Sequence, residues 1–340
     1  MKADIAVLGS GGFGLALAIM LDNMGHRITV WSKFEQEIED IRRDGENKAK
    51  LPGVKIPDSI SFTAELSCVK DKDIVIFGIP VNFVRSVAAE AAPYFNEKTV
   101  IVNTGKGLEA ATLKRMSQVL AEEIPQCKMV VLSGPSHAEE VALGMPTTMV
   151  AASAETGCAE YIQTMMSSDV VRIYNSSDVI GCEIGGALKN VIALCGGICD
   201  GMGYGDNTKA ALMTRGIFEI SRLGIAMGAQ AETFAGLTGI GDLIVTCTSM
   251  HSRNRRAGIL IGQGVAPEEA VKQIGTVEGY FCTKAAYELA KQQGISMPIT
   301  EKCYNVLFNN GNVRESISEL MVRPKKHETE INFMLDKLDN

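Results

Sequence analysis

One lysine stands alone in a long apolar stretch. Between residues 179 and 199, Lys189 is the only cation, and its helical neighbours Gly185, Gly186 and Ala193 are all small. Each glycine inside a helix costs about 1 kcal/mol relative to alanine, so the two glycines indicate that something approaches this face. An enclosed ammonium can donate to a carbonyl oxygen, or release its proton because burial lowers the pKa of a lysine. The pattern predicts acid–base chemistry on a carbonyl/alcohol pair; a lysine that reaches solvent from the helix edge is the alternative.

A second group of polar residues stands at a predicted helix start. Ser252, Arg253 and Asn254 offer a hydroxyl, a guanidinium and an amide, and Arg255 and Arg256 follow them. Such a cluster can bind an anion. For Arg255 and Arg256 we expect a solvated helix face instead.

Further polar residues follow predicted strands. Lys106 lies between Gly105 and Gly107, directly after a strand, and residues 133–138 (Ser-Gly-Pro-Ser-His-Ala) form a turn after another. Ligands of open α/β sheets bind beyond the carboxyl ends of strands, so we expect Lys106 to point into that crevice. Asp242, between glycines and apolar residues, either orients Lys189, binds a hydroxyl or caps a helix.

The chain begins with a pattern typical of dinucleotide binding. Gly9, Gly11 and Gly14 follow the apolar run 5–8, and a helix-forming stretch, 15–21, comes next. In a strand–turn–helix unit the glycines allow a tight turn and close approach of the pyrophosphate, which binds at the helix N-terminus. A plain glycine-rich turn is the alternative.

The end of the second predicted strand bears on the choice of cofactor. NAD-specific folds usually place an acid there to hold the ribose 2′-hydroxyl, whereas this strand ends Val-Trp-Ser-Lys at 30–33. Ser32 can bond a 2′-oxygen and Lys33 can neutralise a 2′-phosphate, so we favour NADPH, with NADH as a possible second cofactor. A solvated Lys33 is the alternative, and Glu35 is near enough to restore NAD binding.

The spacing of apolar residues predicts the elements that carry these side chains. Strands are expected at 4–8, 27–31, 73–79, 98–102, 128–133, 147–152 and 170–174, and helices between them at 13–24, 34–43, 81–92 and 112–123. Continuous Val/Ile runs indicate a doubly wound parallel sheet covered by helices. Later helices are expected at 179–199, 207–227, 231–236, 254–263, 267–274, 281–293 and 298–309. The fold class is therefore α/β, with a Rossmann domain at 1–178 and an all-α substrate-binding and catalytic domain at 179–340.

Composition limits the function classes. The net charge of −7 gives no general attraction for nucleic acid. The nine cysteines are scattered, and Cys195 and Cys199 are more simply core residues than metal ligands, so no metal site is expected. The long apolar stretches are interrupted by Gly, Lys and Asp, which argues against a membrane span. We expect a reduced, cytoplasmic protein.

The last residues form a separate pattern. From Glu328, the apolar residues Ile331, Met334, Leu335 and Leu338 fall on one helical face. Docking on the rest of the chain, docking on a partner subunit and a frayed end are all compatible with this pattern.

Taken together, the motifs resemble one family. Gly-Ser-Gly-Gly-Phe-Gly at 9–14, Thr-Gly-Lys-Gly-Leu-Glu at 104–109 and Ser-Gly-Pro-Ser at 133–136 begin the series. Gly-Gly-Ala-Leu-Lys-Asn-Val at 185–191, Gly-Ile-Gly-Asp-Leu at 239–243 and Ser-Arg-Asn-Arg-Arg at 252–256 continue it. In order and spacing they resemble the bacterial NAD(P)-dependent glycerol-3-phosphate dehydrogenases, from the first strand to about His327.

The resemblance implies reduction of dihydroxyacetone phosphate to sn-glycerol 3-phosphate, a precursor of glycerophospholipids, by a cytoplasmic homodimer. It implies that Lys189 is the catalytic proton donor and acceptor. The substrate contacts that it implies are Lys106, Gly134, Ser136, Lys189, Asp242, Ser252, Arg253 and Asn254. The cofactor contacts are Gly9, Gly11, Gly12, Phe13, Gly14, Lys33, Lys106, Ala138, Arg253 and the stretch Thr276-Val277-Glu278.

Two departures and two rivals accompany this interpretation. The family more often has one more residue before Glu278-Gly279, so the positions there can be off by one, and the family usually ends near His327. A β-hydroxyacid dehydrogenase or ketopantoate reductase shares the two-domain plan, but it uses a Lys-x-x-x-Asn spacing, whereas here Ala193 occupies the fourth position. A non-catalytic dinucleotide sensor would not need Lys189, Asp242 and Arg253 together.

Overall fold

The first part of the chain alternates strands and helices. The structure, a computed structural model, describes residues 2–325 and residue 328. The strands are β1 (Asp4–Leu8), β2 (Arg27–Trp31), β3 (Ser61–Thr63), β4 (Ile74–Phe77), β5 (Val100–Asn103), β6 (Lys128–Ser133), β7 (Thr147–Ala152) and β8 (Val171–Ser176). The helices are α1 (Gly12–Asn23), α2 (Glu35–Asp44), α3 (Val84–Ala91), α4 (Met116–Glu123), α5 (Ala138–Ala142) and α6 (Thr156–Met166), with 3-10 turns at Leu66–Val69, Val81–Phe83 and Ala92–Tyr94.

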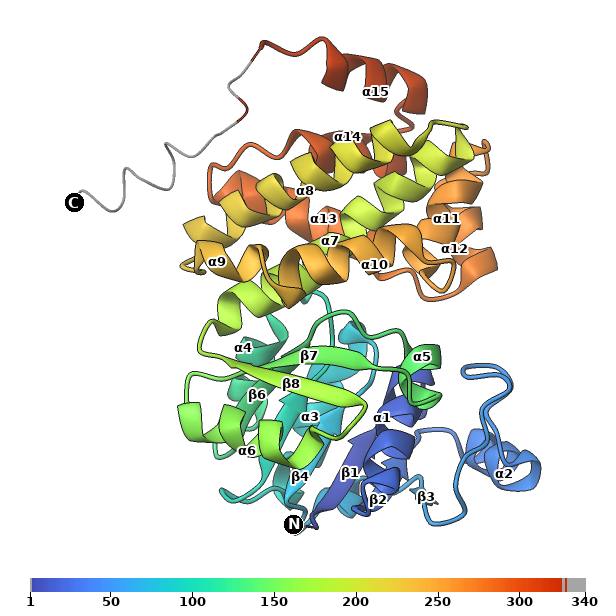
Figure 1. The fold of residues 1–340 in the computed structure, drawn as a ribbon, viewed down its shortest axis with the longest axis vertical. Coiled ribbons are helices and arrows are strands. Elements are labelled where there is room, and N and C mark those ends of the chain that lie inside the picture. The colour runs from blue at the N-terminus through green and yellow to red at the C-terminus, as the bar shows by residue number, and fades with distance from the viewer. Residues whose placement is uncertain (1, 326–327, 329–340) are drawn as a thin grey trace, which may run out of the picture.

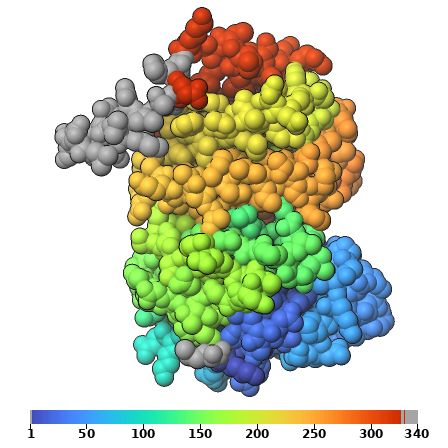
Figure 2. Space-filling model, in the orientation of Figure 1, coloured from blue at the N-terminus to red at the C-terminus, as the bar shows by residue number. Residues whose placement is uncertain are grey.

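The second part is helical throughout its described residues. It contains α7 (Val179–Gly201), α8 (Asp206–Ala226), α9 (Ala231–Phe234), a π-helical turn (Leu237–Gly241), α10 (Asp242–Thr248), α11 (Arg253–Gly262), α12 (Pro267–Ile274), α13 (Glu278–Gln292), α14 (Pro298–Phe308) and α15 (Val313–Met321). Figure 1 shows these helices stacked on the sheet domain, with α7 leading from one part to the other. In Figure 2 the surfaces of the two parts meet directly along this junction.

The eight strands form one sheet in the order β3-β2-β1-β4-β5-β6-β7-β8. Every residue of β4 and β5 is buried, because helices cover both faces of the sheet. From β1 the chain adds strands first towards β2 and then towards β4. The glycine-rich loop therefore leaves the sheet where its strand order reverses, which is the usual ligand position in doubly wound folds.

The sheet confirms the predicted α/β fold class with one exception. β7 runs antiparallel to β6, whereas it pairs in parallel with β8. The reason is the connection: α5 has only five residues, too short a helix to carry the chain back across the sheet for a parallel strand. The sequence also missed the short strand β3 and the helices α5, α6, α10 and α15.

The long helix α7 forms the centre of the helical part. Its length and composition would suit a membrane span, but 89% of its most apolar window is buried inside the fold. Glycines let α11 approach it at backbone distance: a Cβ added to Gly197 would lie 2.1 Å from the Arg255 carbonyl oxygen. The amphipathic tail predicted after Glu328 lies outside the described residues.

Candidate functional site

Lys189 is enclosed in the middle of α7, with only 5% of its surface exposed. Its Nζ lies 2.9 Å from Asp242 Oδ1 and donates to Thr246 Oγ1 at 2.6 Å. Asp242 and Thr246 are one turn apart on α10, so both side chains lie on the helix face that meets α7. The Thr246 hydroxyl in turn donates to the Asp242 carbonyl at 2.6 Å. Of the three sequence-based alternatives for Asp242, the structure supports orientation of Lys189.

A second lysine shares the same carboxylate. Lys106 follows β5, and its Nζ donates to Asp242 Oδ2 and to the Gly134 carbonyl, both at 2.8 Å. Asp242 is thus bracketed by two ammonium groups, one from each part of the chain. An ammonium has three donors, so each lysine keeps one N–H that these contacts leave unused. The three side chains form a compact donor site around a buried carboxylate.

Burial and charge set the proton affinities of this cluster. Burial and, to a smaller extent, the charge of Lys106 lower the pKa of Lys189 to about 8 against the opposing effect of Asp242. Burial alone would raise the pKa of Asp242, but the two lysine charges outweigh it and hold that pKa below its ordinary value. Asp242 is therefore ionised at neutral pH, while Lys189 is poised to release or take up a proton.

Protein atoms occupy the space beside the glycines next to Lys189, which corrects part of our interpretation. A Cβ on Gly185 would lie 2.5 Å from the Thr238 carbonyl oxygen, and one on Gly186 would lie 2.9 Å from Ser133 Oγ. The sequence correctly predicted that something approaches this face closely. At Gly185, the approaching group is the backbone of the π-helical turn.

A chain of amides fixes Lys106 from behind. The Gly279 N–H donates to Asn254 Oδ1 at 2.8 Å, Asn254 Nδ2 donates to Asn190 Oδ1 at 2.9 Å, and Asn190 Nδ2 donates to the Lys106 carbonyl at 3.1 Å. Asn254, which the resemblance placed at the substrate, therefore ties α7, α11 and α13 together here. Asn190, next to Lys189 in sequence, was not predicted to have a role. The sequence could have indicated this role, because Asn190 is a polar amide next to Lys189 in an otherwise apolar stretch.

The basic cluster separates into two kinds of residue. Ser252 caps α11 by accepting from the Arg255 N–H, and the exposed side chain of Arg253 makes no hydrogen bond or ion pair with any described residue. Arg255 contradicts the expected solvated face: its Nε lies 2.8 Å from Asp200 Oδ2, and only 15% of its side chain is exposed. Arg256 is half-buried, and its buried Nε has no hydrogen-bond partner within the described part of the chain, so it too departs from the expected solvated face. Arg253 is the exposed arginine that is available to an anion at this helix start.

The turn after β6 lies beside the lysines. Gly134 has φ +123°, a conformation that favours glycine, and its carbonyl accepts from both Lys106 and the Ser136 hydroxyl. The structure therefore brings together Lys106, Gly134, Ser136, Lys189 and Asp242.

The glycine-rich loop has the shape that a pyrophosphate requires. A Cβ on Gly14 would lie 2.3 Å from the Gly9 carbonyl, and one on Gly12 would lie 2.7 Å from the Lys50 carbonyl and 3.6 Å from the Ala138 Cβ. A Cβ on Gly11, in contrast, would meet no atom nearer than the Gly78 carbonyl oxygen at 4.0 Å. No described side chain caps the N-terminus of α1, and its first turn holds no acid. Its free N–H groups can donate hydrogen bonds to phosphate oxygens, so the loop fits a dinucleotide.

The remaining predicted cofactor residues lie at different depths. Phe13 packs partly buried against the core, and Lys33 is exposed just beyond β2. Val277 is fully buried in the helical core. Glu278 reaches the sheet domain, where the Val81 N–H hydrogen-bonds it, although burial raises its pKa.

Sequence reasoning missed one acid near the end of β2. We considered Glu35, which is exposed, whereas the carboxylate of Glu37 accepts hydrogen bonds from Ser10 and Ser32. Glu37 is one turn before the buried Ile41, so the apolar pattern of α2 could have placed it on the inward face.

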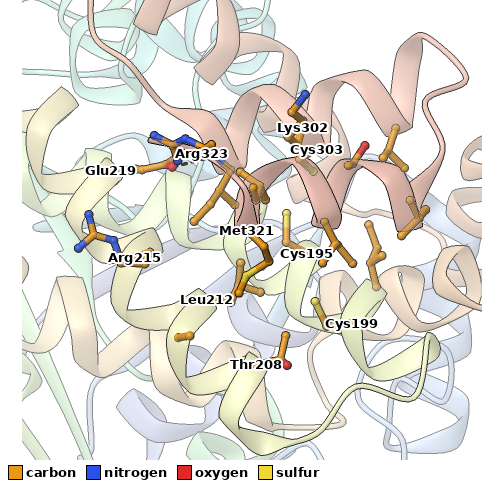
Figure 3. Close-up of a pocket in the computed structure, with 18 of the residues that line it drawn as sticks. Cys195, Cys199, Thr208, Leu212, Arg215, Glu219, Lys302, Cys303, Met321 and Arg323 are labelled. Atoms are coloured by element: carbon orange, nitrogen blue, oxygen red, sulfur yellow. Dashed lines mark hydrogen bonds between the residues drawn. The ribbon is translucent and has the colours of Figure 1, made fainter. Parts of the chain in front are cut away.

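A cavity of about 430 Å³ lies elsewhere in the helical domain. Figure 3 shows its lining, which includes Cys195, Cys199 and Cys303 and none of the predicted site residues. Burial raises the pKa of Cys199 to about 11, so this thiol is not ionised at neutral pH.

A sheet with a dinucleotide loop at its switch point, joined to a helical domain that supplies a buried lysine, defines a two-domain nicotinamide-dependent dehydrogenase. Two family models cover most of the chain: the NAD-dependent glycerol-3-phosphate dehydrogenase N-terminus matches residues 4–159, and its C-terminus matches residues 178–318. The chain belongs to this family.

Known proteins agree at several levels of similarity. A glycerol-3-phosphate dehydrogenase [NAD(P)+] from Moorella thermoacetica is 52% identical over 97% of this chain and 99% of its own length. The crystal structure of glycerol-3-phosphate dehydrogenase from Coxiella burnetii superposes with a TM-score of 0.91 at 34% identity, covering 95% of this chain and 99% of that one. A ketopantoate reductase from Ralstonia eutropha reaches a TM-score of 0.59 at 14% identity, covering 94% and 99%, and shares the fold alone.

Proposed function

We propose that the chain reduces dihydroxyacetone phosphate to sn-glycerol 3-phosphate with a reduced nicotinamide dinucleotide, supplying glycerophospholipid synthesis. One observation carries the proposal: Lys106 and Lys189 bracket the carboxylate of Asp242, and each keeps a free donor. Two such donors can hold the oxygen of one carbonyl group. Relatives of this chain are named glycerol-3-phosphate dehydrogenase [NAD(P)+], the enzyme of this reaction.

Lys189 serves as the general acid. When bound, the reduced nicotinamide supplies a hydride to the carbonyl carbon of the substrate. The carbonyl oxygen then takes a proton from Lys189 Nζ, and the reverse reaction returns it. A pKa of about 8 suits both directions near neutral pH. Asp242 and Thr246 hold the ammonium in one orientation, while Lys106 positions the substrate oxygen.

The phosphate of the substrate binds at the start of α11. The side chain of Arg253 is exposed there and makes no hydrogen bond or ion pair within the described residues, although its charge acts on Glu278. Its guanidinium can form a two-pronged contact with a phosphate. The N-terminal end of α11 adds to the attraction for an anion. Ser252, Asn254, Gly134 and Ser136 complete the proposed substrate contacts, and Asn254 also fixes the site through Asn190 and Gly279.

The cofactor extends from the glycine-rich loop towards the lysines. We propose contacts from Gly9 to Gly14, from Ala138 and from Glu278, with Lys106 and Arg253 touching both ligands. The exposed Lys33 favours the 2′-phosphate of NADPH, and NADH is a second cofactor.

The wider organisation follows from the family. We propose that residues 1–178 bind the dinucleotide and that residues 179–340 supply substrate binding and catalysis. We further propose that the protein is a cytoplasmic homodimer that uses small molecules and no metal.

The test follows NADH and NADPH oxidation with dihydroxyacetone phosphate in the parent protein and in Lys189→Met. Loss of the general acid should lower kcat at least about 100-fold and leave the dissociation constants of the cofactors unchanged. Lys209→Met is the matched control, because Lys209 is partly buried and, like Lys189, paired with a carboxylate, Asp200. No turnover by the parent protein would refute the proposed reaction, and an active Lys189→Met variant would refute the role of the lysine.

A further inference from the structure

A cluster of polar side chains joins three segments near the end of β2. Glu37 Oε2 accepts from Ser10 Oγ at 2.5 Å and from Ser32 Oγ at 2.7 Å. Glu37 Oε1 accepts from Asn47 Nδ2 at 3.0 Å. Both serines and the asparagine are buried, whereas Glu37 is partly exposed. The carboxylate thus has a fixed position and an accessible side.

That position is defined by the strand and by the glycine-rich loop. Ser10 lies between Gly9 and Gly11, and Ser32 directly follows Trp31, the last residue of β2. The Gly9 N–H donates to the Trp31 carbonyl at 2.9 Å, so the loop and the strand end are held together. In dinucleotide-binding folds the adenosine ribose lies at this strand end, beside the loop. Glu37 therefore lies where the 2′-position of the ribose is read.

We propose that Glu37 shifts the choice between NADH and NADPH towards NADH. Its carboxylate accepts a hydrogen bond from the 2′-hydroxyl of NADH and repels the 2′-phosphate of NADPH. A carboxylate has about four acceptor positions, and Ser10, Ser32 and Asn47 fill three, which leaves one for the ribose. Lys33 acts in the opposite direction, so the preference is the balance of two side chains. The inference rests on the proposed function only in assuming that the chain binds a nicotinamide dinucleotide.

A purely structural role for Glu37 predicts a different outcome. If Glu37 only anchored α2 to the loop, then its removal would weaken both cofactors equally. Glu37→Gln separates the two roles, because glutamine keeps the shape and the serine hydroxyls can either donate or accept. The substitution removes the charge and leaves the anchor.

The experiment measures dissociation constants on the full chain, independently of turnover. Trp31 is the only tryptophan and adjoins the site, so quenching of its fluorescence reports binding of NADH or NADPH. In Glu37→Gln the ratio of the NADH to the NADPH dissociation constant should rise about 10-fold. Glu39→Gln, an exposed acid on the same helix, should leave the ratio unchanged. A ratio in Glu37→Gln within about twofold of the parent value would overturn the inference.

A second measurement needs no variant. The parent protein should bind 2′-deoxy-NADH about 10-fold more weakly than NADH, since the analogue lacks the hydroxyl that Glu37 accepts from. Equal affinities would overturn the proposed contact even if Glu37→Gln failed to fold. Failure of the parent protein to bind either natural dinucleotide would instead refute the proposed function, so the two failures are distinguishable.

Discussion

Asp242→Asn should move the pH dependence of the reaction towards acid. The substitution removes a negative charge 2.9 Å from Lys189 Nζ and keeps the size of the side chain. At an effective dielectric of about 20, a unit charge at this distance acts with roughly 6 kcal/mol, an upper bound for a pair that can relax. Neighbouring opposite charges shift a pKa by about 1 to 3 units in practice. The pKa of Lys189, about 8 in the parent protein, should therefore fall to between about 5 and 7.

The expected loss follows from the fraction of Lys189 that carries its proton. With a fall of about two units, kcat/KM for dihydroxyacetone phosphate reduction at pH 7.5 drops roughly 25-fold from protonation alone. The loss of activity becomes smaller as the pH is lowered towards 5.5, because a larger fraction of Lys189 is then protonated. Thr246→Val is the matched control: it removes a hydrogen bond to Lys189 and no charge, so its pH limb should move less.

The assay is the pH profile of kcat/KM between pH 5.5 and 9.5 for the parent protein and both variants. A limb that stays near pH 8 in Asp242→Asn, with activity reduced equally at every pH, would refute the reasoning. Asp242 would then act by binding substrate rather than by holding the lysine proton.

Three further predictions address the phosphate, the cofactor loop and a buried acid. Arg253→Gln should raise KM for dihydroxyacetone phosphate about 10- to 100-fold with little change in kcat. The control Arg314→Gln, at an exposed position of α15, should change neither value, and an unchanged KM in Arg253→Gln would contradict the phosphate role. Gly12→Ala should weaken NADH binding about 10-fold or more, because its Cβ would lie 2.7 Å from the Lys50 carbonyl oxygen. The control Gly157→Ala, which adds a methyl group in open space on α6, should bind NADH normally, and equal affinities in the two variants would contradict the argument about the loop. Glu219, whose pKa burial raises to about 7, binds its proton more tightly folded than unfolded, so its stabilising contribution is present below about pH 4.5 and lost as the pH rises to about 7. The parent protein should therefore lose up to about 3 kcal/mol relative to Glu219→Gln between pH 4.5 and pH 8, measured by chemical denaturation, and a pH-independent difference would contradict the assigned pKa.

The sequence predicted the parts of the site that local patterns encode. Apolar runs located most strands and helices, the glycine spacing located the loop proposed to bind the cofactor, and the isolation of Lys189 marked the centre of the candidate site. These signals are local because a strand, a turn or a helix face is specified by neighbours a few residues apart. The antiparallel β7 was missed because strand direction depends on the route of a connection, which periodicity does not describe.

Side-chain partners across the fold could not be predicted in the same way. Asn254 was predicted as a ligand contact, and the structure shows in addition that its amide meets Asn190 and Gly279, partners that the sequence did not indicate. Glu37 was missed although Glu35 was considered, because two residues along a helix change the direction of a side chain by more than half a turn. In both cases the residue type was visible in the sequence, and its partner was set by packing between distant segments.

The site depends on contact between the two parts of the chain. Lys106 comes from the sheet domain, whereas Asp242 and Lys189 come from the helical domain. The Lys106–Asp242 ion pair crosses the junction, and so does the hydrogen bond between Val81 and Glu278. Because the charge of Lys106 helps to lower the pKa of Lys189, the sheet domain adjusts the acid that the helical domain carries. The protonation state of the cluster therefore depends on the packing of the two domains, and the proposed acid–base chemistry lies at the same junction where cofactor and substrate must meet.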